Sequence, residues 1–242
     1  MGGPDPTDVG LLRCNEYLEQ ARRSGSRLTE ATALAIRSVL KAYRGSFDEA
    51  REDITAGRAL LFDLGGELWW AGTSMLQGDI ELTAGDPQSA YDVLAEGHRV
   101  LSGHAETGYL ATVVGLRAVA ALRLGRDDEA IELAEETGRL AQKDDFEPHA
   151  RAGLVRAIVE ARRGHLDEAE DLLRQAAGLI EATDYLFLHV ALNLSRAEVA
   201  VLAGRPEDEH EALERALSAA AEKGCLVVER RIQERLAQLS RD

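Results

Sequence analysis

The sequence predicts an all-α fold, a solenoid of about 12 antiparallel helices wound into a right-handed α-α superhelix. The first observation is a series of five glycines at spacings of 40, 40, 39 and 40 residues, namely Gly45, Gly85, Gly125, Gly164 and Gly204. The second is a small residue seven positions before each glycine, namely Ser38, Gly78, Ala118, Ala157 and Ala197. The third is composition, because only 5% of the 242 residues are aromatic and 5 are proline, while most apolar residues are the helix formers Ala and Leu.

The segment around Gly164 shows the unit that repeats. Residues 146–163 place apolar side chains at helical spacing on one face, namely Ala150, Leu154, Ala157, Ile158 and Ala161. Gly164 then ends this helix, because glycine readily adopts the left-handed backbone conformation that closes many helices. Asp167 and Glu168 follow with the negative charge that favours a helix N-terminus. The unit is therefore predicted to be a helical hairpin with glycine at its turn.

The same pattern assigns every element along a single tandem-repeat domain of residues 1–242. A half-repeat at 7–24 precedes five hairpins at 28–63, 67–102, 106–143, 146–182 and 186–223, and a capping helix at 226–239 follows them. The first helices of the hairpins are expected at 28–44, 67–84, 106–124, 146–163 and 186–203. The second helices are expected at 47–63, 87–102, 127–143, 166–182 and 206–223. The two end pieces are expected to cover the core that a solenoid otherwise exposes.

The small residues allow the two helices of each hairpin to approach closely, since a larger side chain there would cost about 1–3 kcal/mol in overpacking. A second small column stands five positions after the glycine, at Ala50, Ala90, Ala130 and Ala169. The fifth hairpin departs from this column with Glu209, and Pro206 lies nearby. Its second helix is therefore expected to start later or to pack differently.

The charge balance disfavours some classes of partner. The chain carries 43 acidic and 28 basic residues, a formal charge of −15, which disfavours binding to nucleic acid or to an anionic membrane surface. Cys14 and Cys225 are far apart in sequence and lack metal-ligand spacing, as expected of reduced thiols in the cytoplasm. We expect no signal peptide and no stretch apolar enough to span a bilayer.

No motif for catalysis stands out. The six histidines form no HExxH pattern, and the acidic runs lack the loop spacing of a calcium site. The chain has no GxSxG motif and no GxxxxGK[ST] phosphate loop. The sequence therefore predicts no catalytic residues, no metal and no cofactor, and we expect that the protein is not an enzyme.

The repeat resembles a known family. Glycine with alanine seven positions before and five after, in helical hairpins, resembles the tetratricopeptide repeat, whose usual period is 34 residues. The longer repeat here is similar to the arrays of maltose-regulator-like signalling ATPases and to the C-terminal repeat region of actinobacterial adenylate/guanylate cyclase–ATPase fusion proteins. The phrases that carry this resemblance are RAIVEARRGHLDEAEDLLRQAAGLIEATDYL, from Arg156, and LSRAEVAVLAGRPEDEHEALERAL, from Leu194. It implies a regulatory, partner-sensing array without chemistry of its own.

One set of residues is a candidate binding site. Eight positions before the repeat glycines stand Arg37, Gln77, Arg117, Arg156 and Arg196, which stacking of the hairpins would place in a row. The same face, extended by helical spacing, adds Trp70, His189 and Asn193. One interpretation is a groove-lining stripe that binds an acidic peptide or a ligand with phosphate or carboxylate groups. The alternative is structural, with the arginines paired to carboxylates of the second helices or, for Arg156, to Glu160.

These observations favour a scaffold that binds a protein or peptide on its inner surface, as a regulatory or sensory domain of a bacterial signalling protein. A second hypothesis is a sensor of a small acidic ligand that uses the arginine row as its clamp. A third is a module for self-association into a homodimer.

Overall fold

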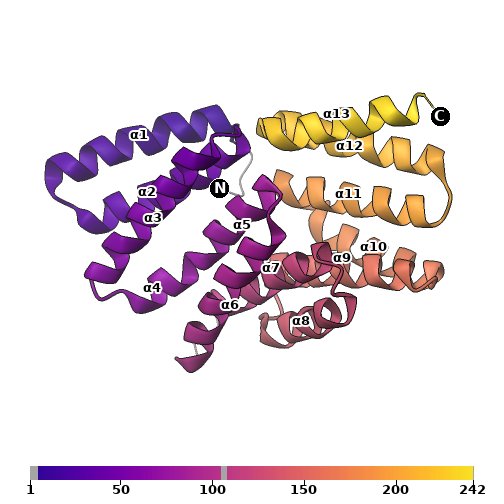
Figure 1. Cartoon of the computed structure of the whole chain (residues 1–242), viewed down its shortest axis with the longest axis horizontal. Helices are drawn as coiled ribbons and strands as arrows, with labels where there is room; N and C mark the ends of the chain where they lie inside the picture. Colours follow the sequence, from indigo (N-terminus) through magenta and orange to yellow (C-terminus); the bar gives the residue numbers. More distant parts are fainter. Residues whose placement is uncertain (1–4, 105–107, 242) are drawn as a thin grey trace.

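The computed structural model describes residues 5–104 and 108–241, which form helices and connecting turns. Thirteen helical segments occur in this part of the chain. In order they are α1 (Thr7–Ser24), α2 (Arg27–Tyr43), α3 (Phe47–Asp63), α4 (Glu67–Gly72), α5 (Ser74–Ala84), α6 (Pro87–Gly103), α7 (Leu110–Arg123), α8 (Asp127–Leu140), α9 (Phe146–Arg162), α10 (Leu166–Ile180), α11 (Leu186–Leu202), α12 (Pro206–Lys223) and α13 (Leu226–Leu239). The all-α helical repeat fold expected from the sequence is confirmed (Figure 1).

The segments form five hairpins between a single helix at each end. The hairpins are α2–α3, α4/α5–α6, α7–α8, α9–α10 and α11–α12, and α1 and α13 flank them. Residues 106 and 107, which begin the third expected repeat, lie outside the described residues, and α7 begins at Leu110. The third hairpin also ends earlier than expected, because α8 stops at Leu140 where Ala141 adopts an extended conformation.

The turn at Gly164 shows why glycine recurs. Gly164 has a φ of +85°, and the backbone N–H of His165 donates to the carbonyl of Glu160 at 2.9 Å, which closes the end of α9. The other four repeat glycines also have positive φ values. A side chain at these positions would strain the turn, so the repeat period follows from backbone geometry.

The second hairpin differs from the expected single first helix because it is interrupted at Thr73. The Thr73 hydroxyl donates to the carbonyl of Trp70 at 2.7 Å, and such bonding of a threonine to its own helix bends the backbone. Gly72 permits this bend to pack tightly, since a Cβ there would lie 2.8 Å from the ring of Tyr109. The two pieces, α4 and α5, together occupy the place of one first helix.

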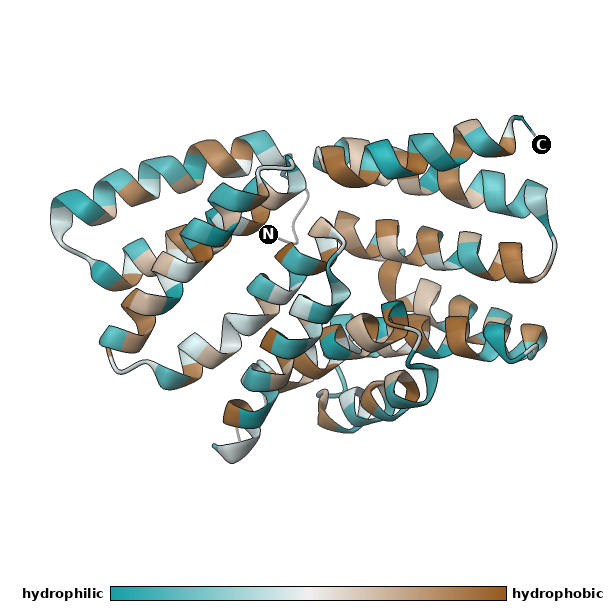
Figure 2. Cartoon of the chain, viewed as in Figure 1, coloured by the Kyte–Doolittle hydropathy of each residue, from teal (hydrophilic) through white to brown (hydrophobic). Residues whose placement is uncertain are grey.

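The helices form two layers (Figure 1). The first helices of successive hairpins pack on one another in the inner layer, whereas each second helix packs on its own first helix and on the next hairpin. The small residues lie at these contacts, as expected: Ala118 and Ala157 are fully buried, and a Cβ at Gly78 would lie 2.7 Å from Leu94 Cγ. The outer helices, such as α1 and α13, alternate polar and apolar residues (Figure 2). No helix in the described residues has the length and apolar character that crossing a membrane requires.

The two ends of the superhelix meet, which the sequence pattern did not predict. In Figure 1 the start of α1 lies beside the start of α13, and the Thr7 hydroxyl donates to the carbonyl of Lys223 at 2.7 Å. Tyr43 of α2 stacks on Phe187 of α11 with ring centroids 4.8 Å apart. One apolar cluster joins Cys14 to Cys225 across this contact. The inner surface is therefore part of a closed arrangement rather than an open groove.

The fifth hairpin corrects one expectation and explains its irregular residue. The second helix, α12, begins at Pro206, so it does not start late. Glu209 is buried, with 4% of its surface exposed, and accepts a hydrogen bond from Arg235 Nε of α13 at 2.6 Å. A charged residue replaces alanine here because the capping helix supplies its partner.

Candidate functional site

The arginine row, defined as Arg37, Gln77, Arg117, Arg156 and Arg196, lies on the outer side of the first helices. Arg37 sits between the outer helices α1 and α3, where its Nε and Nη2 each donate to Asp53 at 2.7 Å. Its Nη1 donates to Asn15 Oδ1 of α1 at 2.9 Å. The row therefore faces the depressions between successive outer helices, here called the outer grooves, and not the inner surface.

Arg117 and Arg196 are also engaged by neighbouring side chains. The Arg117 guanidinium lies 4.6 Å from the ring centroid of Tyr91, donates to the Tyr91 hydroxyl and is 3.7 Å from Glu129. Arg196 donates to Glu181 at 3.0 Å and to Asn193 Oδ1 at 3.3 Å. These contacts match the structural alternative for the row, in which the outer helices supply the partners.

The other predicted residues of this face are held by contacts within the fold. The Arg58 guanidinium lies over the ring of Trp70, with its central carbon 4.5 Å from the ring centroid. The adjacent Trp69 is 49% exposed. His189 Nε2 donates to the carbonyl of Thr183 at 2.9 Å, and Asn193 Nδ2 donates to the carbonyl of His189 at 2.8 Å. Gln77 is half-buried at the equivalent place on α5.

Arg156 differs from the other arginines of the row. It is exposed, and in the described part of the chain it makes no hydrogen bond or ion pair. Glu160, the partner considered from sequence, instead accepts hydrogen bonds from His165 Nδ1 at 2.7 Å and from Arg163 Nη1 at 3.0 Å. The guanidinium of Arg156 is therefore free to bind a group from outside the chain.

Arg156 lies in an outer groove of about 1000 Å³ over α9, between α8 and α10, which we call the α9 groove. Its basic lining residues are Arg139, Lys143, His149 and Arg156, and its acidic ones are Glu135 and Asp144. Its apolar floor and wall include Phe146, Ala152, Leu172 and Leu179. The α9 groove thus combines apolar surface with a local excess of positive charge in a strongly acidic protein.

A second site, which sequence reasoning missed, is a cavity of about 190 Å³ inside the superhelix, here called the central cavity. It is lined from α5, α7, α9, α11 and α13 by Asp79, Arg123, Arg151, Arg162, Glu198 and Arg231 among apolar residues. Arg123 and Arg162 both stand two positions before a repeat glycine, and Asp79 and Glu198 both stand six positions before one, but neither position is charged in all five hairpins. The signal that could have found them is a charged residue on the otherwise apolar inner face of a first helix.

Most of these charges are paired. Arg151 donates to Glu147 at 2.8 Å, and Arg162 donates to Glu198 at 2.7 Å. Asp79 accepts a hydrogen bond from the Tyr43 hydroxyl at 3.0 Å, and burial raises the pKa of this carboxyl although Arg151 opposes the shift.

Arg123 and Arg231 are the exceptions. Arg123 Nη1 donates to the carbonyl of Leu82 at 2.8 Å, and among the described residues neither arginine has a carboxylate within ion-pair distance. Burial first, and then the positive charge of Arg231, lowers the pKa of Arg123.

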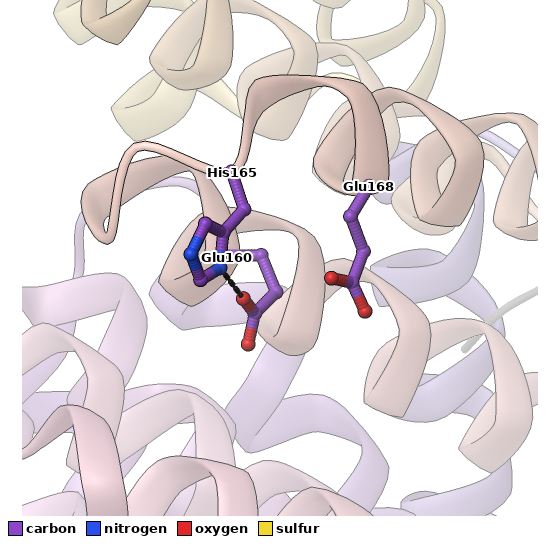
Figure 3. Close-up of side chains that lie close together, drawn as sticks. All are labelled: Glu160, His165 and Glu168. Atoms are coloured by element: carbon purple, nitrogen blue, oxygen red, sulfur yellow. Dashed lines mark hydrogen bonds and ion pairs between the residues drawn. The ribbon is translucent and has the colours of Figure 1, made fainter.

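One group of three potential metal ligands occurs in the described residues, at the turn after α9. Glu160, His165 and Glu168 have ligand atoms within 4.8 Å of one another, and Figure 3 shows the His165–Glu160 hydrogen bond with Glu168 beside it. The hydrogen bond from His165, together with Arg163, lowers the pKa of Glu160. These contacts account for the cluster as the polar end of a helix, and we assign it no metal.

Comparison with known proteins identifies the fold only. No protein family and no curated protein matches the sequence. The structure of BtubC (BKLC) from P. vanneervenii is similar, with a TM-score of 0.64 and 14% sequence identity over 90% of this chain and 92% of that chain. At this identity the likeness supports the helical repeat architecture and carries no residue roles.

Proposed function

We propose that this chain is a non-catalytic binding domain that holds an acidic segment of a partner protein in the α9 groove. The observation that carries the proposal is Arg156, an exposed arginine without a partner in the described chain, at a repeat position where Arg37 and Arg117 are paired. A regulatory role in a cytoplasmic signalling protein accords with the resemblance to repeat arrays and is part of the same proposal.

The chemistry of the α9 groove suits such a segment. Arginine binds carboxylates through two parallel hydrogen bonds, and Arg139 and Lys143 add positive charge along the same wall. Leu172 and Leu179 offer apolar surface to side chains that alternate with the acidic ones. The groove volume, about 1000 Å³, is at the upper end of the range for ligand sites, which suits several side chains rather than a single small molecule.

The net charge of −15 makes the binding of acidic segments more selective for the α9 groove. Acidic segments are repelled by most of the surface, so productive binding depends on the few basic residues of the α9 groove. His149 is oriented there, because its Nε2 donates to the carbonyl of Gln142 at 3.0 Å.

A peptide titration tests the proposal. A fluorescein-labelled peptide of alternating Glu and Leu is titrated by fluorescence anisotropy, with a peptide of alternating Gln and Leu as the uncharged control. We expect the charged peptide to bind better, and Arg156→Ala to weaken its binding about tenfold through loss of a charge-assisted pair. Arg99→Ala, which removes an exposed arginine of α6 outside the groove, is the matched variant and should bind normally.

Two results would overturn the proposal. One is equal binding of the charged and uncharged peptides, or of neither peptide, by the wild-type chain. The other is equal loss of binding in Arg156→Ala and Arg99→Ala, which would trace the effect to overall charge.

A further inference from the structure

We propose that the central cavity is a second binding site, for a small organic anion that has one carboxylate or phosphate group and a short apolar body. Its anchors are Arg123 of α7, at the middle of the chain, and Arg231 of α13, near its C-terminal end. This site lies on the inner face of the superhelix and is separate from the α9 groove.

The arginines of the cavity that lack an ion pair favour an anion, since Arg151 pairs with Glu147, and Arg162 with Glu198 and Asp127, but Arg123 and Arg231 have no such partner in the described chain. Four arginines line it, namely Arg123, Arg151, Arg162 and Arg231, against two carboxylates, Asp79 and Glu198. The protein as a whole has the opposite excess, with a formal charge of −15. Arg123 and Arg231 are exposed at the edge of the cavity, so their unpaired charge lies where an anion can reach it from solvent.

Arg123 and Arg231 carry the excess. The carbonyl of Leu82 at the C-terminal end of α5 accepts a hydrogen bond from Arg123, but it supplies a dipole and no full counter-charge. Arg231 lies against the same helix end, with its Nη2 at 3.3 Å from the position of a Cβ at Gly85. Two like charges held at one helix end repel each other, and an anion between them relieves that repulsion.

The acidic groups nearby are occupied. Glu198 pairs with Arg162, and Glu147 pairs with Arg151. Asp79, which also lines the cavity, accepts the hydrogen bond of Tyr43. The remaining N–H groups of Arg123 and Arg231, which are exposed at the cavity, are therefore available to an acceptor from outside the chain.

The rest of the cavity wall is apolar and limits the size of the ligand. Leu116, Val119 and Ile158 line one side, and Phe187, Val190 and Val228 line the other. One buried water molecule needs about 10–15 Å³ of cavity volume. The cavity, at about 190 Å³, therefore has room for on the order of a dozen water molecules. This space suits a head group with a body of about six carbons. Phe187, one of the lining residues, stacks on Tyr43 and so joins this wall to α2.

Calorimetric titration tests the proposal with probes of matched shape. Hexanoate and hexyl phosphate are the two anionic probes, and hexanol is the neutral control. We expect at least one anion to bind the wild-type chain, the tighter of the two identifying the head group, and hexanol to bind at least about tenfold more weakly. No binding of either anion at about 10 mM, or equal binding of hexanol, would overturn the proposal.

Neighbouring arginines of α13 provide the matched variants. Arg231→Gln is expected to weaken anion binding about tenfold, whereas Arg230→Gln, at an equally exposed position that does not line the cavity, is expected to leave binding unchanged. Without ligand, Arg231→Gln should raise the melting temperature, because it removes the repulsion on Arg123. If the Arg231→Gln protein folds and binds the anion as tightly as the wild type, the proposal is overturned. The acidic peptide binds elsewhere, so its affinity for Arg231→Gln reports on the α9 groove alone.

Discussion

The first and fourth hairpins place an arginine at the same repeat position and use it differently. Arg37 is clamped by two hydrogen bonds to Asp53, whose surface is 8% exposed, and Lys41 adds a contact to the same carboxylate at 3.0 Å. Arg156 is exposed and has no partner in the described chain. Asp53 lies eight residues after Gly45, and the equivalent position after Gly164 is Leu172. The role of a repeated arginine is therefore decided by what the next helix places opposite it.

The third hairpin shows a further way to occupy the same arginine. Tyr91, six residues after Gly85, bridges Arg117 and Glu129 through its hydroxyl. The position six residues after Gly125 is Ile131, which cannot bridge Arg156 in this way. Leu172 stands where the first hairpin has Asp53, and Ile131 stands where the preceding repeat has Tyr91. These two differences leave Arg156 without the partners that Arg37 and Arg117 have.

Removing the two arginines separately should separate their roles most clearly. Arg37→Ala leaves the buried Asp53 carboxylate with Lys41 as its remaining cation, and we expect the free energy of unfolding to fall by about 2 kcal/mol. Arg156→Ala should change it by less than about 0.5 kcal/mol, because an exposed side chain without partners is removed. Urea denaturation of both variants measures this contrast, and equal losses of stability would show that Arg156 is structural as well.

A graft should convert the fourth hairpin to the behaviour of the third. Ile131→Tyr places a hydroxyl where Tyr91 stands one repeat earlier, with Glu168 in the place of Glu129. We expect the new tyrosine to hold Arg156 and to reduce affinity for the acidic peptide about threefold by making its guanidinium less available. Ile131→Leu is the control for altered packing. If both variants bind the peptide equally well, the partner pattern does not explain why Arg156 is free.

The smallest effect concerns Glu160, which turns away from Arg156 to bind His165 and Arg163. Its pKa is lowered in the folded chain, so the carboxylate contributes stability above its unfolded pKa and loses that contribution as the pH falls through the lower folded value. Glu160→Gln should therefore cost at most about 0.5 kcal/mol at neutral pH, and this difference should vanish in acid. Thermal melts of both proteins across the acidic range test the sign. A difference that grows as the pH falls would contradict it.

Much of the fold was predictable because it repeats. Glycines with positive φ end the first helices, and small residues such as Ala157 mark the close contacts, so the helix bounds agree with the sequence pattern to within a few residues over most of the chain. The interruption at Thr73 was not predictable from periodicity, because it depends on one hydroxyl and on the ring of Tyr109.

The contact between the two ends of the superhelix could not be predicted from the repeat pattern. Thr7 and Lys223 meet across 216 residues, and Tyr43 stacks on Phe187. Such contacts depend on the summed rotation of all hairpins rather than on any one of them.

The candidate sites were only half visible for a similar reason. The sequence showed that the arginines of the row recur at one repeat position. It did not show which face of the first helices packs inward, and the structure places the row on the outer face. Arg123 shares its repeat position with Arg162 alone, and it comes close to Arg231 only because α13 packs back toward the middle of the chain. A functional position in a repeat protein is thus best sought where the repeat is broken.

The most direct test is a spectrum that compares both hairpins in one sample. Side-chain Nε–Hε resonances of the arginines are followed by nuclear magnetic resonance while the peptide of alternating Glu and Leu is added. The account predicts that the Arg156 resonance shifts progressively to saturation while that of Arg37 stays in place. Shifts at Arg37 with none at Arg156 would contradict it.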